Sequence, residues 1–253
     1  MSPLYLQLLV GVIIGLGAGY LGSFMILKRM SLVGDVISHV ALPGIAIALL
    51  FEVNPFFGAF GTLFLAILGI WMLERKTEIP SETLVGIFFA LSLAVGILIT
   101  PEPELLEALF GDIAKITLAD AFITVGLTAL MFFIVAKIYR GLTLSVISKE
   151  LAQSMGVNVS RISLLFLLMV ALIVALGLKV TGTFLMGALV IVPAAAAKNV
   201  SLNMSRYTTL SGVFGALSGL IGIFIATHFN LHPGPIVVLT SGVIFLATLL
   251  FKK

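Results

Sequence analysis

Two side chains within an otherwise apolar stretch have the types and the spacing to bind a divalent cation. Asp35 and His39 lie four residues apart in KRMSLVGDVISHVALPGIAIA, residues 28–48. On a helix such a pair shares one face, with Cβ atoms about 6 Å apart. A carboxylate and an imidazole can hold a cation between them, and both are costly to place in hydrocarbon without a partner or a water-filled path. The plainer alternative is that Asp35 caps a helix and His39 bonds a backbone carbonyl.

The composition places this pair in a membrane protein. Of the 253 residues, 60% are hydrophobic and 10% are charged, and the mean hydropathy is +1.26. Soluble domains carry about 25% charged residues. The absence of cysteine excludes disulfides and thiolate metal sites, so His, Asp, Glu, Asn or backbone oxygen must supply any metal ligands. The first ten residues lack a basic segment and lead into a long apolar run, which is typical of a retained helix rather than a cleaved signal peptide.

The apolar runs predict an all-α fold, a polytopic transmembrane helical bundle of eight or nine spans. Strand-like alternation is absent, and helices are then the only way to satisfy the backbone in lipid. Because runs of about 20 residues consume the length, residues 1–253 are predicted to be a single transmembrane domain. Two short runs contain Pro43 and Pro193, and each is a candidate for a broken or half-crossing helix. The runs are 4–27, 35–51, 56–73, 83–100, 118–138, 161–179, 182–198, 207–227 and 235–251.

The basic residues predict the orientation of the bundle. If residues 137–161 are cytoplasmic and each run crosses once, only Lys115 and Lys179 of the 14 lysines and arginines lie outside. Positive charge gathers on the cytoplasmic side of membrane proteins, so the N terminus is predicted outside and the C terminus inside. The acidic segment 100–117 then lies outside, and Asp120 is predicted to be an interface cap without a role in a pore.

The inside segment 137–161 predicts a short amphipathic helix at the cytoplasmic face. Ser148 is typical of an N-cap, Lys149–Met155 would form the helical turn, and Gly156 would end it. Such a helix is either a solvated connector or a knob that docks into a partner protein.

Glycines repeat at a spacing of four residues in two of the apolar runs. Gly11, Gly15 and Gly19 repeat every fourth residue, as Gly215 and Gly219 do, which favours close helix packing.

A histidine pair stands beside the turn that precedes the last apolar run. His228 and His232 are four apart on the predicted outer side, where they are a candidate site for first binding of an ion. The alternative is that they are exposed histidines beside a Pro-Gly turn with no ligand role.

Three segments resemble the permease subunits of ATP-binding-cassette importers for zinc, manganese and iron, the metal-ion ABC-3 type. The first, RMSLVGDVISHVALPGIAIALL, carries the signature. SKELAQSMGV is similar to the family's cytoplasmic coupling loop, and VTGTFLMGALVIVPAAAA is similar to a later run of the family. The resemblance covers essentially the whole chain. The matching signature residues are Met30, Ser31, Leu32, Gly34, Asp35, Ser38, His39, Leu42, Pro43 and Gly44.

The resemblance implies a permease of the type II-like importer class in a bacterial or archaeal cytoplasmic membrane. Two copies would form a homodimer whose path is lined by Asp35 and His39. ABC ATPase subunits would bind the coupling loop 141–160 from inside, and an extracellular or periplasmic metal-binding protein would deliver the ion. The transported substrate would be zinc or manganese, with iron as a third candidate. The coupling residues implied are Ser148, Glu150, Ala152, Met155 and Gly156.

The resemblance also implies which activities are absent from this chain. No permanently bound cofactor, nucleic-acid partner or enzymatic activity is expected. Because the chain lacks a Gly-x-x-x-x-Gly-Lys-Ser/Thr loop, ATP hydrolysis is assigned to a separate subunit.

Other classes of protein fit these patterns less well. A stand-alone secondary metal-ion transporter would need coupling-ion carboxylates spread over several helices. A permease for a metal chelate or a vitamin B12-like substrate would share the coupling loop, but it has no reason to keep Asp35 and His39 at this spacing. An intramembrane metalloprotease would need His-Glu-x-x-His, which is absent.

Overall fold

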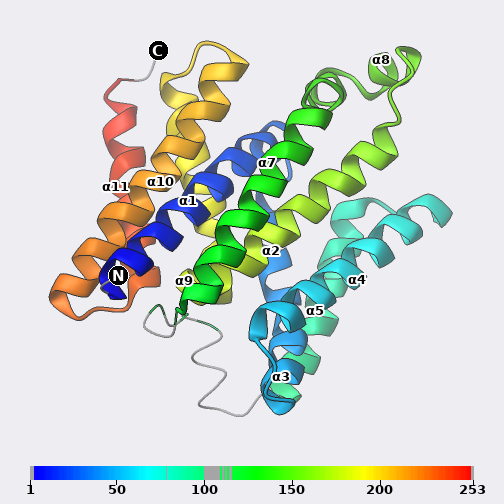
Figure 1. Cartoon of the computed structure of the whole chain (residues 1–253). Helices are drawn as coiled ribbons and strands as arrows, with labels where there is room; N and C mark the ends of the chain where they lie inside the picture. Colours follow the sequence, from blue (N-terminus) through cyan, green and yellow to red (C-terminus); the bar gives the residue numbers. More distant parts are fainter. Residues whose placement is uncertain are drawn as a thin grey trace.

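The computed structural model is a bundle of helices joined by short turns (Figure 1). It describes residues 3–77, 79–99, 109, 111, 113 and 116–251, and these residues contain no β-strand. The predicted all-α class is therefore confirmed for this part of the chain. The helices are α1 (Pro3–Leu27), α2 (Ser31–Val40), α3 (Leu42–Leu50), α4 (Pro55–Lys76), α5 (Ser81–Ile99), α7 (Leu118–Ile147), α8 (Lys149–Ser154), α9 (Val159–Val200), α10 (Met204–Phe229) and α11 (Pro233–Leu249).

Six segments of the described residues are long and apolar enough to cross a membrane, and three shorter helices are also apolar. The long segments are Leu4–Leu27, Val33–Leu50, Pro55–Lys76, Leu118–Ile147, Val159–Thr183 and Met204–Phe229. The shorter helices are Thr83–Ile99, Leu185–Val200 and Pro233–Leu249. Each of the nine predicted runs therefore has a helical counterpart.

The run predicted at 35–51 is a broken helix. Ala41 ends α2 and its N–H bonds back to the carbonyls of Ser38 and His39, while Pro43 stands in the first turn of α3. Proline fits there because the first N–H groups of a helix have no partner within the helix. Together the two helices form the single apolar segment Val33–Leu50.

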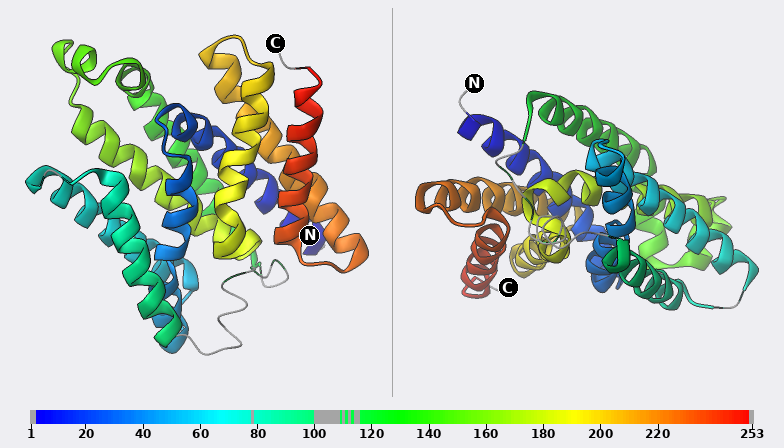
Figure 2. Two further views of the ribbon diagram at one scale, coloured as in Figure 1. Left: turned by 180° about the vertical axis from the view of Figure 1, so that it is seen from behind. Right: turned by 90° about the horizontal axis from the view of Figure 1, so that it is seen from below.

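Helix α9 consists of two helices that meet at Gly182. Its 42 residues would measure about 63 Å, roughly twice the hydrocarbon thickness of a bilayer. Gly182 has φ 70° and ψ 176°, a conformation that is essentially restricted to glycine. The second half, drawn in yellow, returns beside α10 and α11 (Figures 1 and 2). The run predicted at 182–198 thus begins at this kink, and it continues through Pro193 without a non-helical residue.

Helix α7 is longer than the sequence indicated. The predicted run stopped at residue 138, but the helix continues to Ile147, so the first part of the predicted inside loop is helical. A charged side chain does not end a helix by itself. Lys137 stays within α7, with its Nζ 4.4 Å from the centre of the Phe133 ring one turn earlier. The helix ends only where the Ser148 N–H bonds the Leu144 carbonyl and Ser148 becomes the cap of α8.

Helices α1 and α10 approach each other with their backbones nearly in contact, as the glycine spacing predicted. A Cβ atom on Gly15 would collide with the carbonyl of Gly215, and one on Gly215 would collide with the carbonyl of Gly15. A Cβ atom on Gly219 would likewise collide with the carbonyl of Gly11, whereas one on Gly11 would first collide with the Ile223 side chain. This pair of helices forms one side of the bundle, and α9 packs on both.

Asp120 caps α7 as predicted, but it also joins three helices. Its carboxylate accepts hydrogen bonds from the N–H and hydroxyl of Thr117, which completes a capping box. Lys179 in α9 places its Nζ 2.9 Å from both carboxylate oxygens, and the Asn54 amide donates from 3.3 Å at the start of α4. The Asp120 side chain is only 10% exposed. The ion pair therefore ties the first half of α9 to α7.

We expect Lys179→Met to lower the thermal unfolding midpoint in detergent. Removing one partner of a partly buried ion pair leaves the other charge without compensation, at a cost of about 2–4 kcal/mol. The double variant Lys179→Met/Asp120→Asn removes that charge as well and should regain part of the stability. A double variant less stable than Lys179→Met would contradict this account.

Candidate metal-conducting site

Helix α2 carries both candidate ligands into the interior of the bundle. It packs against α9 and α5, with further contacts to α1 and α4. Asp35 and His39 are both half-buried, so neither faces freely outward and neither is fully enclosed.

Ser38 anchors α2 to the second half of α9. Its hydroxyl lies 2.6 Å from the carbonyl of Thr183, next to the kink, and 2.6 Å from the carbonyl of Asp35. Ser38 and Thr183 are both fully buried. Because one hydroxyl hydrogen serves both carbonyls, it donates to one at a time. The register of the two candidate ligands is thereby fixed against the start of the returning helix.

Gly187 provides the space that Asp35 occupies. A Cβ atom built on Gly187 would lie 2.6 Å from Asp35 Cβ and 2.7 Å from Asp35 Oδ1. Separations below 3.0 Å do not occur between real Cβ atoms and their neighbours, so any larger residue would displace α2 or the carboxylate. Gly187 is not among the residues predicted from the sequence, although it lies within the third segment of the family resemblance.

His39 faces α5. Its ring stands edge-on to the Phe89 ring, with centroids 5.5 Å apart. Asp35 therefore lies beside the returning half of α9, whereas His39 packs against α5. Two different neighbours position the two candidate ligands.

One chain offers two ligands from its described residues, fewer than a transition-metal site requires. Among those residues no group of three or more histidine and acidic side chains is arranged to hold a metal ion. Zinc in proteins takes four ligands, and a transported ion also requires weak enough binding to leave. Any complete coordination sphere must draw on water, backbone oxygen or a second copy of the chain.

The predicted cytoplasmic helix is present as α8. The Ser148 hydroxyl accepts a hydrogen bond from the Leu151 N–H and donates one to Glu150 Oε2 at 2.7 Å. The hydrogen bond from Ser148 holds the pKa of the exposed Glu150 carboxyl below its usual range, so the carboxylate stays ionised near neutral pH. Gly156 has φ 77° and ends the turn, as predicted.

The residues of α8 divide into an anchor and an exposed face. Ala152 is fully buried, whereas Glu150 is exposed and Met155 is 52% exposed. Nothing lies within 4 Å of a Cβ built on Gly156. A protruding turn with one anchored alanine has the form of a docking knob.

The two histidines that are predicted on the outer side lie on the turn between α10 and α11. His228 is in the last turn of α10, with its ring against those of Phe224 and Phe229. His232 is the N-cap residue of α11, and both side chains are exposed. This turn is at the end of the bundle opposite α8 (Figure 1). A role in ion binding stays a prediction.

A bundle with six helical segments long and apolar enough to cross a bilayer is typical of a polytopic membrane protein. The family model of the ABC 3 transport family matches residues 3–252. The chain belongs to that family, and the resemblance found in the sequence is confirmed.

Several similar proteins are named as manganese or zinc transport proteins. The chain is 33% identical over 254 residues to the manganese transport system membrane protein MntC of Listeria monocytogenes, covering 99% of this chain and 91% of that protein. It is 34% identical to the manganese import system permease protein ScaB of Streptococcus gordonii, covering 95% and 88%. It is 32% identical to the high-affinity zinc uptake system membrane protein ZnuB of Haemophilus influenzae, covering 99% and 97%.

Two solved structures share the fold. PsaBC from Streptococcus pneumoniae in complex with Fab matches with a TM-score of 0.87 and 32% identity, over 98% of this chain and 91% of that chain. An inward-facing conformation of a putative metal-chelate type ABC transporter matches with a TM-score of 0.78 and 18% identity, over 97% and 85%. At 18% identity the second match establishes the fold alone.

We expect Gly187→Ala to lower ion uptake several-fold while the protein still folds, because overpacking by one methyl group costs about 1–3 kcal/mol and displaces the Asp35 carboxylate. The matched control is Gly86→Ala in α5, where an added Cβ meets nothing within 4 Å. Uptake and the unfolding midpoint are measured for both. Wild-type uptake by Gly187→Ala would show that Asp35 needs no space there.

Proposed function

We propose that the chain is the permease subunit of an ATP-driven importer that moves a divalent transition-metal ion, Mn²⁺ or Zn²⁺, into the cytoplasm. The observation that carries the proposal is the half-buried pair of Asp35 and His39 on α2, in a chain of this family. A carboxylate and an imidazole suit both ions, and iron remains a third candidate. The names of the relatives, which state manganese or zinc, support the same two ions.

The coordination argument favours two copies of the chain. A homodimer would bring two carboxylates and two imidazoles to a shared path, enough for four protein ligands. Such a site lacks thiolates, because the chain has no cysteine, and this favours release over tight storage.

The path of the chain supports nine crossings, with the N terminus outside. α2 and α3 together would cross once, and the two halves of α9 would cross in opposite directions. α1 begins at one end of the bundle, and α11 ends at the other, where α8 lies (Figure 1). Lys28, Arg75 and Lys149 line one cavity at the α8 end, which agrees with a cytoplasmic position for that end.

The partners follow from this orientation. ATPase subunits would dock on α8, and an extracellular metal-binding protein would deliver the ion at the opposite end, in a bacterial cytoplasmic membrane. ATP binding would pull the α8 helices and rock the two permease copies about their interface, so that the path opens inward. His228 and His232 remain candidates for first contact with the ion.

We expect Glu150→Ala and Gly156→Val to uncouple ATP hydrolysis from uptake. Glu150 is exposed on the proposed knob, and Gly156 has a positive φ that a β-branched residue rarely adopts. Metal-stimulated ATPase activity should fall several-fold while metal binding by the permease is kept. Ser154→Ala, at the end of α8, is the control. Full coupling in both variants would exclude the docking role.

The decisive experiment is uptake into vesicles that contain the permease, its ATPase and its binding protein. Manganese, zinc and ferrous ions compete in the assay, and omission of the ATPase is the control. ATP-dependent uptake of one of these ions is expected. Uptake without the ATPase would instead identify a stand-alone secondary transporter, and uptake of a chelate alone would identify a permease for metal chelates or vitamin B12-like substrates.

A further inference from the structure

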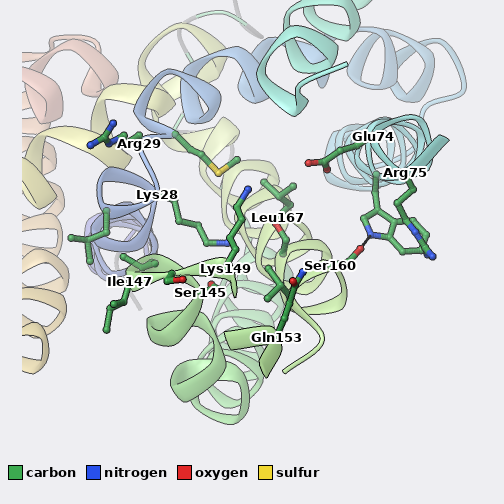
Figure 3. A pocket seen from close by; sticks show the side chains of 17 residues that line it. Lys28, Arg29, Glu74, Arg75, Ser145, Ile147, Lys149, Gln153, Ser160 and Leu167 are labelled. Atoms are coloured by element: carbon green, nitrogen blue, oxygen red, sulfur yellow. Dashed lines mark hydrogen bonds between the residues drawn. The ribbon is translucent and has the colours of Figure 1, made fainter. Parts of the chain in front are cut away.

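A cavity of about 610 Å³ lies at the α8 end of the bundle, among the ends of five helices (Figure 3). The ends of α1, α4 and α7 and the starts of α8 and α9 form its walls. This volume is within the range of small-molecule sites. It is separate from Asp35 and His39, neither of which lines it.

The charge of the lining is strongly unbalanced. Lys28, Arg29, Arg75 and Lys149 line the cavity together with one carboxylate, that of Glu74. Among the residues that the structure describes, none of these four cations forms an ion pair. Figure 3 shows Lys28 and Lys149 extending into the space between the helices, with Glu74 and Arg75 on the α4 side. The cavity therefore has basic side chains without acidic partners.

Lys28 is half-buried next to a second cation. Burial, and next the ammonium group of Lys149, lower the pKa of Lys28 to about 8, although Glu74 acts in the opposite direction. The cation–π contact of Lys28 gives only weak compensation, since its Nζ lies 5.3 Å from the centre of the Phe166 ring. An anion between Lys28 and Lys149 would relieve both the burial of charge and the repulsion.

The remaining walls are those of a site at a membrane surface. Leu27, Met30, Ile147 and Leu167 give the cavity apolar sides. Trp71 donates its indole N–H to Ser160 Oγ at 2.9 Å, and the Arg75 guanidinium stands 4.9 Å from the Trp71 ring. Tryptophan beside arginine is typical of the level of lipid headgroups. A free inorganic anion has no use for apolar walls, whereas a phospholipid has.

We infer that this cavity binds a phosphate group, carried by an anionic phospholipid of the leaflet at the α8 end. Basic pockets between membrane helices bind such headgroups through charge-assisted hydrogen bonds. The inference does not depend on which ion is transported. Because Ser148, Lys149 and Gln153 belong to both this cavity and the α8 segment, a bound lipid would stabilise the base of the proposed docking knob.

The test compares wild type with Lys28→Gln/Lys149→Gln in nanodiscs of phosphatidylcholine, with and without phosphatidylglycerol. Retained lipid is counted by native mass spectrometry, and the unfolding midpoint is recorded. The control, Lys198→Gln/Arg206→Gln, removes two exposed cations from the same end of the bundle but away from the cavity. We expect phosphatidylglycerol to raise the midpoint of wild type and control, and the cavity variant to retain about tenfold less of it.

Further arms make the result unambiguous. The single variant Lys149→Gln, at an exposed position, should also retain less lipid if the double variant does not fold. Equal retention by the cavity variant and the control would overturn the inference. If millimolar phosphate in phosphatidylcholine alone gives the same stabilisation, the ligand is free phosphate and not lipid. If wild type binds phosphatidylglycerol alone but loses it on adding the ATPase, the cavity binds lipid as inferred, but its stabilising role at the base of the knob in the assembled transporter is excluded.

Discussion

Asp35→Asn and His39→Ala are each expected to abolish ion uptake, with a loss of at least about tenfold in metal affinity, while assembly with the ATPase is kept. Asn has nearly the shape of Asp, so the contact with Gly187 and the Ser38 anchor remain, and only the charge is lost. Because His39→Ala removes the ring packed on Phe89, His39→Gln is a second variant that keeps more of that volume.

Glu52→Gln, which alters an exposed carboxylate between α3 and α4, is the control for a general loss of charge. His228→Ala removes an exposed imidazole at the α10–α11 turn and tests the candidate for first contact with the ion. Uptake is measured in vesicles with the ATPase and binding protein, and assembly by co-purification. Normal transport by both Asp35→Asn and His39→Gln would reject the site. A loss of ion uptake in His228→Ala would show that the α10–α11 turn also takes part in the ion path.

Gly15→Leu is expected to prevent α1 and α10 from packing and to eliminate most of the folded protein. Even Gly15→Ala should lower the free energy of unfolding by about 1–3 kcal/mol, because its Cβ would collide with the Gly215 carbonyl and the backbone must move. Side chains can adopt another rotamer, whereas two helix backbones can only separate. Lipid offers no hydrophobic force to hold helices together, so close packing has to do so.

The matched control is Gly126→Leu in α7. Gly126 is exposed, and an added Cβ there meets nothing within 4 Å, so the substitution should be neutral or stabilising by up to about 1 kcal/mol. Thermal unfolding and monodispersity in detergent are compared for the two variants. Equal stability would mean that the glycine repeat on α1 is incidental.

Local features were predictable from the sequence because each depends on residues only a few positions apart. The Ser148 cap, the Gly156 stop, the break near Pro43 and the glycine face of α1 all follow from spacing along one helix, and all are present. The apolar run ends nine residues before α7 does, because the basic side chains after residue 136 lower the hydropathy without ending the helix. They extend from a continuous helix.

The sequence by itself determined that the chain is an all-α membrane protein, which family it belongs to, and which ionisable pair on α2 is the candidate site. Apolar composition, i to i+4 spacing and a dense motif are properties of the chain and need no partner. Only the tertiary structure decided that Gly187 accommodates Asp35, that Ser38 bonds Thr183 across 145 positions, and that Lys179 neutralises Asp120 across 59. The first two contacts arise when the chain reverses at Gly182, and the third arises when it reverses between α7 and α9. Each reversal brings distant segments together, and no local pattern specifies the partners.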